Sequence, residues 1–72
     1  MTDLSELTTP DKILDTALEK EQQAHDFYEQ LAAKCQVDFV SELLQTLQNE
    51  ESKHMHLIRE MKQRLESGHS ML

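Results

Sequence analysis

Three side chains of the kind that bind metal ions interrupt the apolar pattern of this sequence. Glu21 falls within one series of apolar residues that recur at three- and four-residue steps, and Glu51 and His54 interrupt a second such series. A carboxylate within an apolar stripe costs free energy unless it is paired, hydrogen-bonded or bound to a metal. Because Glu51 and His54 are three residues apart, a helix points both side chains the same way, and together they can bind one metal ion.

The apolar periodicity around these residues predicts an all-α chain of two helices, since no alternating strand pattern is present. The first helix is expected over residues 10–34, where Thr9 can cap free amides and Pro10 suits the first helical position. The second is expected over residues 38–67, with Gly68 as its C-terminal cap. The chain then divides into a flexible N-terminal arm, a helical hairpin and a C-terminal tail, at residues 1–9, 10–67 and 68–72.

The reversal between the two helices decides which residues face one another. The break in the periodicity lies near Val37, and the helices are expected to run antiparallel on either side of it. Glu21 lies 16 residues before Val37, so it faces position 53, between Glu51 and His54. Three side chains that can ligate a metal therefore fall at one height on facing helices.

The length and composition of the chain favour a small domain that associates with copies of itself. A chain of 72 residues builds only a small core, and such chains usually depend on disulfides, metals or oligomerisation. Cys35 is the only cysteine, so an internal disulfide is excluded, and metal binding and self-association remain. A formal net charge of −7 disfavours binding to nucleic acids and to anionic membranes. No apolar run exceeds three residues, so we expect a soluble chain without a membrane span or a secretion signal of its own.

Two hairpins paired about a two-fold axis would gather two copies each of Glu21, Glu51 and His54 around one centre. Four carboxylates would then balance the charge of two divalent cations. This mixture of oxygen and nitrogen ligands suits iron or manganese, whereas the absence of thiolate clusters argues against a structural zinc site or an iron–sulfur cluster.

Two stretches of the sequence resemble the ferritin-like di-iron proteins, and within them the rubrerythrin-like and encapsulated-ferritin branches. The first is EQQAHDFY, from Glu21 to Tyr28, and the second is NEESKHMHL, which contains the Glu-x-x-His element of Glu51 and His54. The resemblance covers residues 13–65 and implies that two hairpins assemble a ferritin-like four-helix bundle. It also implies two iron ions per dimer, with manganese or zinc as substitutes. The iron ligands would be Glu21, Glu51 and His54. Tyr28 would be a catalytic residue near the metals.

The activity implied by this resemblance is that of a ferroxidase, which oxidises Fe(II) to Fe(III) at a site shared between two subunits, for iron storage or detoxification. Two alternatives remain open. One is a peroxide reductase that takes electrons from a separate donor protein, and the other is a non-catalytic hairpin whose polar residues set the register of an oligomer. The expected partners are further copies of the chain, as a homodimer or a larger homo-oligomer, together with an encapsulin-type shell or an electron-donor protein. The expected location is the cytoplasm, including the interior of a protein nanocompartment.

Each candidate residue also has a simpler structural explanation. Glu21 can lie at the edge of the apolar stripe and reach solvent, and Glu51 and His54 can belong to a solvated helical face. Tyr28 can pack in the core with its hydroxyl satisfied. His25 is expected at the surface or as a subsidiary metal contact, since it lies four residues after Glu21.

Overall fold

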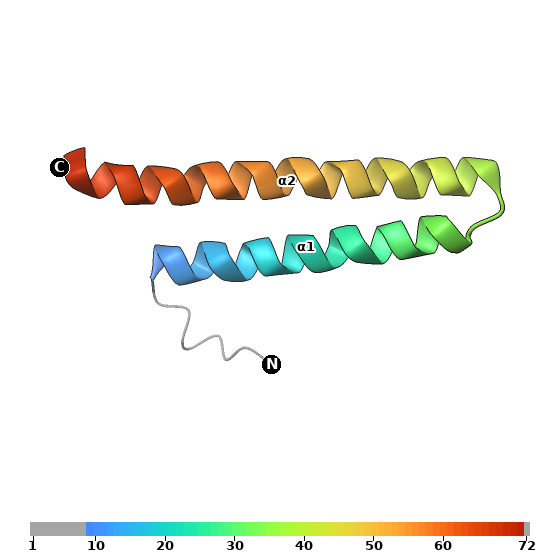
Figure 1. Ribbon diagram of the computed structural model, residues 1–72, viewed down its shortest axis with the longest axis horizontal. Coiled ribbons are helices and arrows are strands. Elements are labelled where there is room, and N and C mark those ends of the chain that lie inside the picture. The colour runs from blue at the N-terminus through green and yellow to red at the C-terminus, as the bar shows by residue number, and fades with distance from the viewer. Residues whose placement is uncertain (1–8, 72) are drawn as a thin grey trace.

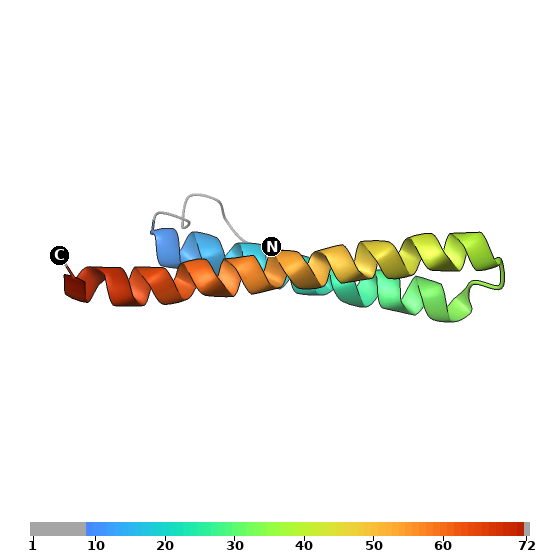
Figure 2. The ribbon, with the colours of Figure 1, turned by 90° about the horizontal axis from the view of Figure 1, so that it is seen from above.

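Two helices make up the chain in the computed structural model, which describes residues 9–71 and the side chains of residues 9–67. Helix α1 spans Pro10–Lys34 and helix α2 spans Asp38–Met71, and the two run antiparallel side by side (Figure 1). Residues 35–37 reverse the chain between them. Seen from above, the helices cross at a shallow angle (Figure 2). The prediction of an all-α hairpin, with its turn near Val37, is confirmed.

Local hydrogen bonds explain where the helices begin. The Thr9 hydroxyl accepts a hydrogen bond from the Lys12 amide at 3.3 Å, and Pro10 occupies the first position, where no amide donor is needed. After the turn, the Ser41 amide donates to the Val37 carbonyl at 2.9 Å, which starts the hydrogen-bond ladder of α2. The predicted starts of both helices are therefore correct.

The C-terminal end of α2 differs from the prediction. The helix continues through Gly68 to Met71, so the expected helix end at residue 67 is wrong, and the expected tail over 68–72 is helical as far as Met71. Glycine lowers helix stability by about 1 kcal/mol relative to alanine, but it ends a helix only where its backbone turns left-handed. Residues 1–8 of the expected N-terminal arm, and the last residue of the expected tail, lie outside the described residues.

The two helices enclose little core by themselves. Among residues 9–67, Met55 is the one buried side chain, with 5% of its surface exposed, and α1 buries none. An ion pair between Lys62 and Asp15 joins the helices near the open end of the hairpin, which is the end opposite the turn. With a single buried side chain in the part that the structure describes, so small a domain needs further contacts for a stable fold.

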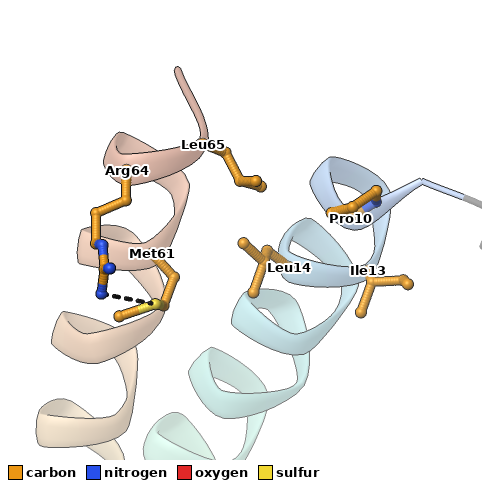
Figure 3. A pocket seen from close by; sticks show the side chains of 6 residues that line it. All are labelled: Pro10, Ile13, Leu14, Met61, Arg64 and Leu65. Atoms are coloured by element: carbon orange, nitrogen blue, oxygen red, sulfur yellow. Dashed lines mark hydrogen bonds between the residues drawn. The ribbon is translucent and has the colours of Figure 1, made fainter. Parts of the chain in front are cut away.

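The helices leave an apolar cleft at the open end of the hairpin. Ile13 and Leu14 of α1 and Met61 and Leu65 of α2 line this cleft, whose volume is about 540 Å³. Figure 3 shows Leu14 and Leu65 pointing into the gap between the two helices. Ile13 and Met61 flank the same cleft, so they lie on the same side of the hairpin.

Exposed apolar side chains continue along this side of both helices. They form what we call the apolar face, which consists of Ile13, Phe27, Leu31, Leu43, Leu57 and Met61. Within each helix they are spaced by 4, 14 or 18 residues, close to whole numbers of helical turns, so they share one side. Soluble proteins rarely leave such a surface uncovered. The apolar face is a stripe along the hairpin and does not surround the helices. Within residues 9–71, neither helix has a stretch long and apolar enough to cross a membrane.

Candidate metal centre

Glu21 of α1 and Glu51 and His54 of α2 come together near the middle of the hairpin. The Nδ1 atom of His54 lies 3.3 Å from Oε2 of Glu21 and 3.8 Å from Oε2 of Glu51. One ligand atom from each residue lies within 4.8 Å of the other two. The turn sets the height at which Glu21 meets α2, and the three-residue spacing puts Glu51 and His54 on one side of that helix.

The cluster lies at the border between the helix contact and solvent. Glu51 is the most sheltered member, with 18% of its side chain exposed, whereas His54 is 51% exposed. His54 precedes Leu57 by three residues and Met61 by seven, so its exposed edge lies on the side of the apolar face. The hairpin therefore covers the cluster from one side and leaves it open on the side of the apolar face.

The three side chains fit a divalent metal ion that accepts both oxygen and nitrogen. Glu21 and Glu51 offer carboxylate oxygens and His54 offers an imidazole nitrogen, a mixture that suits iron and manganese. Ferritin-like bundles hold two metal ions with one Glu from each of two helices and a Glu-x-x-His pair from each of the other two. One hairpin supplies one Glu and one such pair, which is half of that set.

A comparison with models of protein families identifies the family of the chain. The rubrerythrin model matches residues 12–72. The chain belongs to the rubrerythrin family. This is a family of ferritin-like di-iron domains, so the resemblance to the ferritin-like and rubrerythrin-like proteins read from residues 21–28 and 49–57 is confirmed, and the encapsulated-ferritin branch stays a prediction. Comparisons with curated proteins and with solved structures gave no match. The cluster of Glu21, Glu51 and His54 is the candidate iron site of this rubrerythrin-family chain.

Tyr28, predicted as a catalytic residue near the metals, lies further along α1. It follows Glu21 by seven residues, or about 10 Å along the helix axis. The side chain is half-buried, and its ring contacts that of Phe27, with the ring centroids 5.9 Å apart. The structure thus brings Glu21 together with the residues of α2 but leaves Tyr28 two turns away, and the catalytic role of Tyr28 stays a prediction.

Two histidines outside the cluster also have polar partners. His56 pairs with Glu60 at 3.1 Å on the exposed surface of α2. His25 of α1 contacts Gln48 of α2, and Gln48 in turn donates a hydrogen bond to Glu29. Glu29 and Gln48 are absent from the residues predicted as functional. The four-residue spacing of His25 and Glu29 is visible in the sequence, whereas no sequence signal distinguishes Gln48 from its neighbours.

Proposed function

We propose that two copies of this chain form a ferritin-like four-helix bundle with a di-iron centre between them, and that this centre oxidises Fe(II) to Fe(III). The observation that carries the proposal is the convergence of Glu21, Glu51 and His54 in a chain of the rubrerythrin family. Each hairpin has half of the ligand set of a ferritin-like di-iron site. A second hairpin would supply the other half.

The apolar face supports this pairing. It lies on the side where His54 is exposed, so a single contact would cover the apolar side chains and complete the half-site together. Covering apolar surface contributes roughly 25 cal/mol per Å², a contribution that the hairpin, with one buried side chain among residues 9–67, largely lacks on its own. Another copy is the partner of choice, because a two-fold axis pairs the same face with itself and brings in the same three ligands.

The charges of the ligands also support the pairing. Two hairpins would supply four carboxylates, two from Glu21 and two from Glu51, against the four positive charges of two Fe(II) ions. Each His54 would add a neutral nitrogen donor. Carboxylates gathered without metal repel one another, and bound cations remove that repulsion. Iron binding and pairing therefore reinforce each other.

Iron is the substrate in this proposal and supplies the redox chemistry. Each Fe(II) loses one electron. Two such electrons and two protons reduce one dioxygen to hydrogen peroxide, or one hydrogen peroxide to two waters. The paired ligands hold two ions in one place, so both electrons become available together, and the carboxylates stabilise the higher charge of Fe(III). Oxidation would serve iron detoxification, or storage if the dimers join a larger assembly or an enclosing compartment.

The test is iron oxidation by the purified chain and by variants of the cluster. Fe(II) is added without oxygen, air is admitted, and the ferric absorbance is followed over time. Glu51→Ala and His54→Ala should lower the oxidation rate to that of buffer. His56→Ala is the matched control, because His56 lies on the same helix, two residues on, with its own partner Glu60. Oxidation by the His54 variant at the parent rate would refute the site assignment. Repeating the assay with hydrogen peroxide under argon identifies the oxidant.

A further inference from the structure

A second group of polar side chains joins the two helices about one turn from Glu21. The side-chain nitrogen of Gln48, on α2, donates a hydrogen bond to Oε2 of Glu29 at 3.1 Å, and it lies 3.4 Å from Nε2 of His25. His25 and Glu29 are four residues apart on α1, so their side chains rise from the same side of that helix. One amide nitrogen thus bridges an imidazole nitrogen and a carboxylate oxygen.

The hydrogen bonds determine which nitrogen of His25 carries the proton. The Gln48 amide nitrogen can only donate, so Nε2 of His25 is unprotonated and accepts through its lone pair. The Nδ1 atom then carries the hydrogen and donates it to Oδ1 of Asp26 at 3.1 Å. Hydrogen bonds from His25 and from Gln22 hold the pKa of Asp26 below its ordinary value, so Asp26 remains a charged acceptor at neutral pH.

This arrangement is that of a metal-binding histidine. Histidines that ligate metals almost always donate their second ring N–H to a carboxylate or a carbonyl, which fixes the ring and raises the basicity of the ligand nitrogen. Neighbouring ligands in a tetrahedral site with bonds of about 2.1 Å lie roughly 3.4 Å apart, close to the two spacings around the Gln48 amide. If the side-chain amide of Gln48 rotates by half a turn, its oxygen Oε1 takes the place of the nitrogen. That oxygen can ligate a metal ion.

We propose that His25, Glu29 and Gln48 form an accessory site for a first-row divalent cation. The ligands are Nε2 of His25, the carboxylate of Glu29 and Oε1 of Gln48. Asp26 is a positioning residue that holds the imidazole. The cation takes the place of the positively polarised amide hydrogens that now bridge the two acceptors.

The accessory site lies away from the apolar face. Glu29 follows Phe27 by two residues, which places the two side chains roughly 200° apart around the helix. A second hairpin that covers Phe27 therefore leaves Glu29 open to solvent. Each chain carries one accessory site, whether or not the chain is paired, and the site does not depend on Glu51 or His54.

The test is zinc binding measured by titration calorimetry at pH 7.5 in the Glu51→Ala/His54→Ala double variant. This background removes the candidate iron site, so the result is independent of the proposed ferroxidase function. One Zn(II) per chain is expected to bind. Adding His25→Ala should weaken binding at least tenfold. Adding Asp26→Asn should keep the stoichiometry and weaken binding about 10-fold to 100-fold, as is typical for the loss of a partner that orients a metal ligand.

The matched control is His56→Ala in the same background. His56 and Glu60 are also four residues apart and paired, but both are exposed and lie on a single helix. Zinc affinity should not change in this variant. Equal affinities for the His25 and His56 variants, or loss of zinc with His56 instead, would overturn the proposal. If the double variant loses its helical circular-dichroism signal, NMR of the parent chain with ¹⁵N-labelled histidines replaces it. The proposal then requires that Zn(II) shifts the Nε2 resonance of His25.

Discussion

Nδ1 of His54 lies 3.3 Å from Oε2 of Glu21, although 33 residues separate them in the chain. This contact joins the middle of α1 to the middle of α2 with a carboxylate and an imidazole, both of which can ligate a divalent metal ion. Around it, one side of the hairpin is apolar and exposed. The association, the metal and the stability of the chain should therefore respond to one another, as the following predictions state.

Metal should stabilise the assembled state. Without metal, four carboxylates from Glu21 and Glu51 of two chains repel one another, so Fe(II) without oxygen should raise the melting temperature and shift the chain towards the dimer. A ligand at 100 times its dissociation constant adds about 2.7 kcal/mol of stability to the state that binds it. Thermal melts with and without Fe(II) measure the effect. Glu21→Ala, Glu51→Ala and His54→Ala should lose the part of this stabilisation that comes from the shared site, because only the accessory site remains in them; a full stabilisation of these variants would contradict the assignment.

A charge on the apolar face should dissociate the assembly. Leu43 is 55% exposed in the single hairpin, so Leu43→Lys should lower the stability of the isolated chain only slightly. The buried charge should, however, prevent a second copy from covering the apolar face. Sedimentation velocity at micromolar concentration should show a dimer or larger species for the parent chain and a monomer for the variant. Gln45→Lys, which adds the same charge at an exposed position two residues on, serves as the control and should remain assembled. A monomeric parent chain would count against pairing through this face.

Tyr28→Phe should separate metal binding from oxidation. Removing the hydroxyl keeps the ring and its contact with Phe27, so the helical signal and the melting temperature should stay close to those of the parent. Tyr28 lies two turns from Glu21, so the bound metal per chain should also be unchanged. The rate of ferric absorbance should fall if Tyr28 has the predicted catalytic role. An unchanged rate would leave Tyr28 with a packing role alone.

The contribution of the ion pair between Lys62 and Asp15 to the stability of the hairpin should be lost at alkaline pH. The carboxylate of Asp15 accepts a hydrogen bond from Lys62 and raises the pKa of the amine above its ordinary 10.5, and the negative charges of Asp11 and Glu66 act in the same direction. Because the pKa of the Lys62 amine is higher in the folded chain than in the unfolded chain, the ion pair adds stability that is fully present below the unfolded pKa. This stability is lost as pH rises through the folded pKa. Asp15→Asn should therefore melt below the parent at pH 8, and the difference should shrink above pH 10.5.

Salt gives the control for this ion pair. Both partners are partly exposed, so 1 M sodium chloride should reduce the difference between Asp15→Asn and the parent at pH 8. A difference in melting temperature that neither alkaline pH nor salt alters would show that Asp15 acts through something other than its charge.

Much of the hairpin could be read from the sequence because helices obey short-range rules. The three- and four-residue apolar steps indicate two helices, Thr9 and Pro10 mark the first start, and counting outward from Val37 places Glu21 opposite Glu51 and His54. The structure agrees on each of these positions. The end of α2 could not be read in this way, because a glycine such as Gly68 is compatible with both a helix and a helix end.

The sequence by itself determined the two helices, their register and the set of residues at the candidate metal centre, since each follows from spacing along one chain. Only the tertiary structure placed Gln48 between His25 and Glu29 and showed how little of the hairpin is buried. Those features depend on the rotation of each helix about its own axis and on the rotamer of each side chain. Packing between the two helices decides both, and the order of residues along either helix does not specify them.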